Sequence, residues 1–206
     1  MAKWPIYILA GGRSSRFGSD KARALIQGET LLVRVARALS PVASRLTIVA
    51  ETPGKYDDLG LRTIADCEQY RGPLSGLRTA IKDNDATSED AWILVAACDT
   101  AHVHPDWIDQ LADQIDDTAK CVAFRSAFWE PLPAFYHTSI RKSVEQLLAS
   151  KKTAIKDLFD FLPSRSAPLP AGWATAGHIN TTEDLRDAKS NLTVKEGLAD
   201  ATRDSC

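Results

Sequence analysis

A loop near the start of the chain carries the residues best suited to binding phosphate. An apolar run, residues 6–9, leads into two adjacent glycines, and four charged side chains follow within nine residues: Arg13, Arg16, Asp20 and Lys21. Glycine lets a backbone approach a ligand closely, and exposed N–H groups with fixed cations form a cradle for phosphates. The whole chain has a formal net charge of −2, so this excess of cations is local.

Two interpretations of this loop remain open from spacing alone. In one, Arg16 and Lys21 neutralise a triphosphate, arginine as a planar fork and lysine as a point charge. In the other, the glycines form a turn and the basic side chains are solvated. The loop is not a Walker A motif, because Gly12 and Gly18 are misplaced and Ala22 follows Lys21. The dinucleotide fingerprint GxGxxG is also absent.

Two aspartates follow apolar runs that we predict to be strands. Asp66 comes directly after Leu61–Ala65, and Asp99 comes after Trp92–Ala97 and Cys98. Ligands of parallel α/β sheets lie at the carboxyl ends of the strands, so one crevice can collect the glycine loop and both aspartates. Opposite a phosphate loop, Asp99 is a candidate Mg²⁺ ligand. Each aspartate is otherwise a helix cap or a turn residue.

Alternating strand and helix patterns predict the architecture. Apolar runs with the length of buried strands occur at Ile6–Leu9, Leu46–Ala50, Leu61–Ala65, Trp92–Ala97 and Lys120–Phe124. Helix signals stand between them, at Leu31–Leu39 after the cap residue Thr30, in the stretch opened by Gly72–Leu77, and at Asp106–Ile115. This alternation predicts an α/β protein with a mostly parallel central sheet and helices on both faces.

The second half of the chain has weaker patterns. Phe128–Tyr136 contains two prolines and predicts an irregular or edge strand, because proline cannot donate to a central ladder. Residues 84–90 are acidic and polar, which predicts a connector between two elements. Further expectations are helices over Ser139–Ala149 and Thr153–Phe161, a loop over Pro163–Gly172, a last strand over Ala174–Asn180 and then a helix beginning at Thr182. We expect one domain over residues 1–190 and a disordered tail over 191–206.

Bulk properties exclude several classes of function. A net charge near zero gives no reason to expect nucleic acid or an acidic membrane as a partner, and no apolar run approaches the roughly 20 residues that span a bilayer. The four cysteines lack CxxC spacing, which favours reduced thiols in the cytoplasm. No GxSxG motif supports a nucleophilic hydrolase. The histidines are too dispersed to predict a metal cluster: His102, His104, His137 and His178.

Four motifs in order resemble those of the molybdenum cofactor guanylyltransferases, which belong to the GT-A-like nucleotidyltransferases. They are the loop from Leu9 to Lys21, Asp66 followed by Gly72–Leu77, Cys98–Thr100 after the most hydrophobic run, and Ile179–Leu185. Residues 131–136 resemble the weaker acceptor-side segment of that family. The resemblance covers residues 6–190. It implies a Rossmann-like, three-layer α/β fold and transfer of GMP from GTP to molybdopterin with Mg²⁺, releasing pyrophosphate.

The resemblance also implies a role for each matching residue. Leu9, Ala10, Gly11 and Gly12 would meet guanine and ribose, Lys21 and Arg16 would hold the phosphates, and Asp66 would contact the nucleotide. Asp99 would ligate Mg²⁺, and Asn180 with His178 would lie on the acceptor side. The implied partners are the two substrates, with transient contacts to cofactor biosynthesis proteins or acceptor molybdoenzymes. We expect a cytoplasmic monomer.

The chain departs from the family pattern at several positions. Glu51 replaces a frequent asparagine near the base, Phe17 replaces methionine, and His178 replaces the first asparagine of the last motif. Ala101 and His102 stand where a proline and an apolar residue are common. Two other functions stay open. One is another NTP-dependent nucleotidyltransferase, such as the cytidylyltransferase of the same cofactor, which Gly12 argues against. The other is a non-catalytic adaptor that binds nucleotide or molybdopterin.

Overall fold

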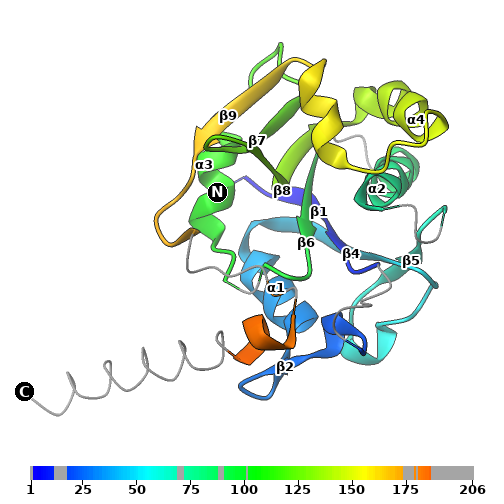
Figure 1. Ribbon diagram of the computed structural model, residues 1–206, viewed down its shortest axis with the longest axis vertical. Helices are drawn as coiled ribbons and strands as arrows, with labels where there is room; N and C mark the ends of the chain where they lie inside the picture. The colour runs from blue at the N-terminus through cyan, green and yellow to red at the C-terminus, as the bar shows by residue number, and fades with distance from the viewer. Residues whose placement is uncertain are drawn as a thin grey trace, which may run out of the picture.

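A seven-stranded sheet forms the centre of the computed structural model (Figure 1), with strand order β5-β4-β1-β6-β8-β7-β9. The structure describes residues 2–11, 18–68, 72–87, 91–100, 102–173, 179 and 181–186. The strands of this sheet are β1 (Trp4–Leu9), β4 (Ala43–Ala50), β5 (Thr63–Ala65), β6 (Trp92–Ala97), β7 (Cys121–Arg125), β8 (Trp129–His137) and β9 (Ser164–Pro168). All except β8 run in one direction, which confirms the mostly parallel sheet.

Helices cover both faces of the sheet (Figure 1). One apolar core joins it to α1 (Leu31–Leu39) and α3 (Pro105–Ala112), and a second joins it to α2 (Pro73–Thr87) and α4 (Arg141–Ala149). The described residues also form five short 3₁₀ turns: η1 (Lys21–Arg23), η2 (Ser40–Val42), η3 (Asp57–Leu59), η4 (Thr138–Ile140) and η5 (Ile155–Asp160). A two-stranded ribbon, β2 (Leu25–Ile26) and β3 (Glu29–Thr30), precedes α1. The three-layer α/β fold is therefore confirmed.

Local signals explain where several elements begin. Thr30 caps α1, as expected, and its hydroxyl accepts a hydrogen bond from Val33 N at 3.3 Å. Five apolar side chains at helical spacing then face the core from α1. α2 begins at Pro73, whose missing N–H costs nothing in a first turn. In the last described segment the helical residues begin at Thr182, as expected, and Thr181 caps them, because its hydroxyl accepts from Asp184 N at 3.0 Å.

Of the two alternatives predicted for Phe128–Tyr136, the irregular strand is confirmed and the edge strand is wrong, because β8 lies between β6 and β7. Its pairing with β7 passes from Ala123–Ala134 directly to Phe124–Glu130, so residues 131–133 form a bulge. Pro131 and Pro133 both lie in this bulge, where no ladder N–H is required. The prolines therefore interrupt a central strand without removing it.

Two other predictions are corrected by the structure. Residues 164–168 form β9 rather than part of a loop. The strand is polar because it pairs only with β7, at the edge of the sheet. The segment predicted as one helix over Thr153–Phe161 forms η5 instead. Most of the predicted last strand, 174–178 and 180, lies outside the described residues, as does 187–206. The domain and tail boundaries therefore stay predictions.

The predicted connector from residue 84 is also wrong, because α2 continues to Thr87. Asn84 is fully buried and accepts a hydrogen bond from Arg45 Nη2 at 3.2 Å. Next to it, Asp83 accepts from Tyr7 OH at 2.8 Å and from both terminal nitrogens of Arg62 at 2.8 and 3.0 Å. These polar residues close the end of α2 against the sheet, so their polarity does not mark a loop.

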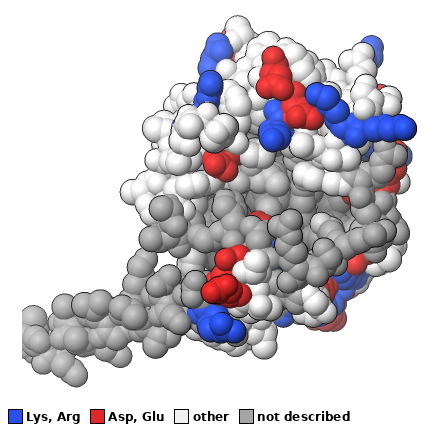
Figure 2. All heavy atoms as spheres, viewed as in Figure 1, with Lys and Arg blue, Asp and Glu red and all other residues white. Residues whose placement is uncertain are grey.

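Charged side chains of both signs are mixed on the surface of the described part. On the face drawn in Figure 2, acidic and basic side chains of the described residues lie next to one another. Within the described ranges, no helix combines the length and apolar character needed to cross a membrane.

We predict that Asp83→Ala lowers the free energy of unfolding by about 2–3 kcal/mol, since it removes the acceptor of the buried Tyr7 hydroxyl and of Arg62. Burial raises the pKa of Asp83, but hydrogen bonds from Arg62 and Tyr7 outweigh it and hold the pKa below its ordinary value. The charged carboxylate therefore stabilises the fold above the ordinary aspartate range, and this contribution is lost as the pH falls through the folded pKa.

Chemical denaturation at neutral and acidic pH checks this prediction. The difference in unfolding free energy between the wild type and Asp83→Ala should shrink in acid. A difference that is absent at neutral pH would contradict the structural role of Asp83.

Candidate active site

The carboxyl ends of four parallel strands are joined by hydrogen bonds that continue past the strands. Ala10 N donates to Val49 O at 2.9 Å, Cys98 N to Leu9 O at 3.2 Å, and Asp66 N to Ala50 O at 2.6 Å. The backbones that lead into the glycine loop, Asp66 and Asp99 therefore lie side by side at one edge of the sheet. This confirms that the three segments meet at one edge of the sheet, and a ligand crevice there stays a prediction.

Lys21 and Asp99 form an ion pair at this edge, with Lys21 Nζ 3.0 Å from Asp99 Oδ2. Both side chains are less than one-fifth exposed. The chain leaves β1 toward β4 on one side and leaves β6 toward β7 on the other, so the pair spans the topological switch point between β1 and β6. Open α/β sheets bind their ligands at such a point.

Two glycines allow the motif Gly72–Leu77 to pack closely beside this edge. Gly76 lies against Leu9, and a Cβ at Gly76 would come within 2.9 Å of Leu9 Cδ2. Gly72 has a φ of +77°, and a Cβ there would come within 2.9 Å of Thr153 O. The first glycine thus lets the chain turn into α2 against Thr153, and the second lets α2 lie directly on the end of β1.

Asp66 ties the end of β5 to α2. Its Oδ1 accepts hydrogen bonds from Ser75 Oγ at 2.7 Å and from Thr79 Oγ1 at 2.9 Å. Thr79 Oγ1 in turn accepts from Cys67 N at 3.0 Å. These contacts support the structural alternative for Asp66, whose Oδ1 also accepts from Glu68 N at 3.4 Å in a local turn. Its contact with a nucleotide stays a prediction.

Sequence reasoning also missed two residues of the loop after β4. Lys55 Nζ lies 2.8 Å from Asp20 Oδ2 and 2.6 Å from Glu51 Oε1. Tyr56 OH donates to Asp20, 3.1 Å from each carboxylate oxygen. Glu51, which departs from the family pattern, is therefore held by a lysine at the end of β4. No spacing rule links Asp20 to residues 51, 55 and 56, so only the fold reveals this cluster.

Comparison with known proteins shows which family the chain belongs to. Residues 6–166 match the model of the MobA-like NTP transferase domain. The chain belongs to this MobA-like family. It is 32% identical over 190 residues to a probable molybdenum cofactor guanylyltransferase of Thermococcus kodakarensis, covering 87% of this chain and 90% of the relative. A relative of the same name from Deinococcus radiodurans is 36% identical over 167 residues, which are 72% of this chain and 75% of the relative.

A solved structure shows the same fold. The crystal structure of molybdopterin-guanine dinucleotide biosynthesis protein A from Archaeoglobus fulgidus has a TM-score of 0.76 at 20% identity, covering 92% of this chain and 98% of that one. This MobA-like protein is thus a nucleotidyltransferase in family and in fold. The family predicted from the four sequence motifs is confirmed.

Several predicted site residues of this MobA-like protein lie outside the described part: Gly12, Arg16, His178 and Asn180. Their roles stay predictions. Between the last two, Ile179 is fully buried and donates through its N–H to Asp99 O at 3.2 Å. Leu9, Ala10 and Gly11 lie at the end of β1, and their contacts with the nucleotide stay predictions.

The described residues contain no group of three His, Cys, Asp or Glu side chains that could hold a metal ion. Mg²⁺ needs fewer protein ligands, because it commonly takes one or two carboxylates and completes its shell with substrate phosphates and water. A single carboxylate at Asp99, beside the ammonium group of Lys21, fits that requirement. Three free thiols lie in the described part, and burial raises the pKa of Cys98 to about 12, so this thiol is neutral.

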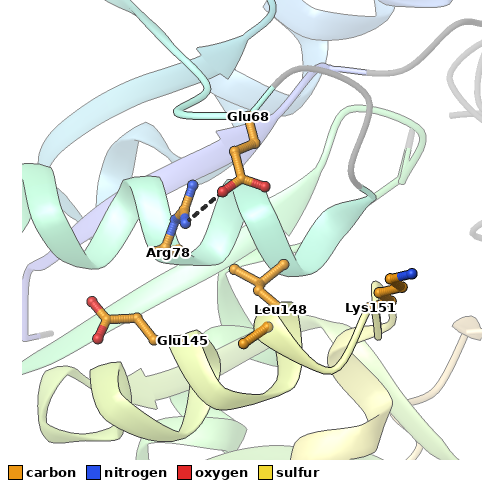
Figure 3. Close-up of a pocket in the computed structure, with 6 residues that line it drawn as sticks. Glu68, Arg78, Glu145, Leu148 and Lys151 are labelled. Carbon is orange, nitrogen blue, oxygen red and sulfur yellow. Dashed lines mark hydrogen bonds and ion pairs between the residues drawn. The ribbon is translucent and has the colours of Figure 1, made fainter.

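A separate pocket of about 590 Å³ lies between α2 and α4. Figure 3 shows Glu68 pointing toward Arg78 of α2, with Nη1–Oε1 at 2.9 Å, while Leu148 and Glu145 come from α4. Lys21 and Asp99 do not line it. The pocket is therefore distinct from the ion pair at the switch point.

We predict that Asp99→Asn lowers the rate of nucleotidyl transfer by about 100-fold or more, because the amide keeps the shape of the side chain but loses the charge. Steady-state kinetics and thermal unfolding check this together, with exposed Asp117→Asn as the matched control. A variant with normal activity would remove Asp99 from the site. A variant that is also unfolded calls for Asp99→Glu, which keeps the charge but misplaces it and should still lose most activity.

Proposed function

We propose that this protein transfers the GMP group of GTP to the terminal phosphate of molybdopterin, forming molybdopterin guanine dinucleotide and pyrophosphate. The observation that carries the proposal is the Lys21–Asp99 pair at the switch point of a MobA-like nucleotidyltransferase fold. The names of the curated relatives support the substrates, since they are probable molybdenum cofactor guanylyltransferases.

Charge dominates the chemistry. An oxygen of the acceptor phosphate forms a bond to the α-phosphorus of GTP, and the bond from that phosphorus to the bridging oxygen breaks as pyrophosphate leaves. The acceptor phosphate is already ionised at neutral pH, so no general base is required. Two anions must approach in line, and the protein contributes by neutralising and positioning them.

Lys21 supplies positive charge to the phosphates of GTP. In the structure the ammonium group of Lys21 is paired with the carboxylate of Asp99. Nucleotide binding therefore requires Lys21 to exchange a carboxylate oxygen for a phosphate oxygen. That exchange costs little, because both partners are anionic and the lysine stem is flexible. Arg16 adds a second cation in this proposal.

Asp99 would hold Mg²⁺ once Lys21 has moved to the phosphates. A bound Mg²⁺ would neutralise charge on the transferred phosphoryl group and the leaving pyrophosphate. The backbone of residues 9–12 would hold the guanosine, Asp66 would contact the nucleotide, and Asn180 with His178 would contact the acceptor. A monomeric state, a cytoplasmic location and contacts with other proteins of the pathway are part of the same proposal.

The decisive experiment uses purified protein with Mg²⁺, molybdopterin and α-labelled GTP or CTP in parallel. We expect transfer of label to molybdopterin and release of pyrophosphate with GTP, and much slower transfer with CTP. A preference for CTP would contradict the guanine assignment and favour the cytidylyltransferase. Tight binding of nucleotide without transfer would favour a non-catalytic adaptor.

We predict that Lys21→Ala costs about 2–4 kcal/mol of transition-state stabilisation, the range for one preorganised electrostatic contact. The ratio kcat/KM for GTP measures this loss, with exposed Lys82→Ala on α2 as the control. A loss smaller than about tenfold, which corresponds to about 1.4 kcal/mol, would make Lys21 peripheral.

A further inference from the structure

The carboxylate of Asp20 anchors the turn that carries Lys21. Its Oδ1 caps the turn η1 by accepting from Ala22 N at 3.1 Å. The same carboxylate accepts from Tyr56 OH at 3.1 Å to each oxygen, and Lys55 Nζ lies 2.8 Å from Oδ2. One side chain, adjacent in sequence to Lys21, therefore joins η1 to the loop after β4.

Tyr56 is a buried hydrogen-bond donor to this carboxylate. It is fully buried, and its hydroxyl also lies 3.5 Å from Ala10 O, at the start of the glycine loop. Burial raises the pKa of Tyr56, so the hydroxyl remains a donor at neutral pH. Burial lowers the pKa of Lys55, but hydrogen bonds to Asp20 and Glu51 outweigh it and raise the pKa, so the lysine stays charged.

Arg23 makes a second attachment at the other end of η1. Its guanidinium donates to Asp58 through two bonds of 2.8 Å and to Lys55 O at 2.8 Å. It also lies over the ring of Tyr56, 5.3 Å from the centroid. Because both ends of a three-residue turn are held, the backbone of Lys21 has little freedom to shift.

This anchoring has a consequence for the lysine. A long flexible side chain binds a phosphate at the right point only if its backbone is fixed, because side-chain rotamer freedom must be lost on binding. Misplacement of about 1 Å in a transfer reaction costs as much as 100-fold in rate. Lys55 further links this anchor to Glu51 at the end of β4, 2.6 Å away.

We propose that Asp20, Tyr56 and Lys55 are positioning residues, which set the place of Lys21 Nζ for the β- and γ-phosphates of the nucleotide. The proposal rests on the phosphate-binding role of Lys21 in the proposed function. It adds that the role of Lys21 depends on a different segment of the chain, because Lys55 and Tyr56 in the loop after β4 hold Asp20.

The test compares binding of GTP with binding of GMP, which lacks the β- and γ-phosphates. In Tyr56→Phe we expect the affinity for GTP to fall by about tenfold or more, the scale of one hydrogen bond to a charged group, while the affinity for GMP stays within about twofold. Isothermal titration calorimetry measures both. An equal loss for GMP and GTP would overturn the proposal, because it would show a general loss of structure.

A double-mutant cycle shows whether Tyr56 acts through Lys21. In the Lys21→Ala background, Tyr56→Phe should cause no further loss of GTP affinity, because no lysine remains to be positioned. The same loss in both backgrounds would overturn the proposal. Unchanged GTP binding and turnover in Lys21→Ala would remove the role of Lys21 on which this proposal rests. The proposed function fails on a different result, the absence of GMP transfer by the wild-type protein, so the two failures are distinguishable.

Tyr7→Phe is the matched control. Tyr7 is also fully buried and donates to an aspartate, Asp83 Oδ2 at 2.8 Å, but it lies in the middle of β1 away from η1. It should lower stability by a similar amount and leave the ratio of GTP to GMP affinity unchanged. If Tyr56→Phe fails to fold, Lys55→Gln repeats the test, and Lys55→Arg should restore the ratio.

Discussion

The ion pair between Lys21 and Asp99 joins residues 78 positions apart in the chain and closes the switch point between β1 and β6. Much of the site's geometry serves to bring these two side chains within 3.0 Å of each other. The ladder bond from Cys98 N to Leu9 O aligns the ends of the two strands. Bonds made by Asp20 and Arg23 then fix the turn that supplies the lysine.

The same pair indicates how the site can keep Lys21 charged and still let it change partners. A lysine at low exposure needs an anionic partner, and Asp99 is that partner in the structure. In the proposed function, the phosphates of GTP would replace Asp99. Exchange of one anion for another conserves the charge balance of the site. The chemistry of GMP transfer then asks for neutralisation and alignment more than for a nucleophile or a base on the protein.

Residues adjacent in sequence to a predicted strand could be placed from the sequence, because parallel strands end at one edge. This holds for Asp66, Asp99 and the glycine loop, and for the family motifs around them. The cluster of Lys55 and Tyr56 on Asp20 was missed, because it forms between segments more than thirty residues apart with no spacing rule. The prolines of β8 and the polar residues of β9 led to wrong predictions. A bulge does not need the ladder N–H that proline lacks, and a strand at the edge of the sheet does not need a continuous apolar run.

A crystal structure with a non-hydrolysable GTP analogue and Mg²⁺ tests the central claim most directly. We expect Lys21 Nζ to leave Asp99 and to lie within hydrogen-bonding distance of a phosphate oxygen, with the nucleotide over the carboxyl ends of β1 and β6. Density for the nucleotide at another edge of the sheet, or at the switch point with the 3.0 Å contact between Lys21 and Asp99 intact, would contradict this account.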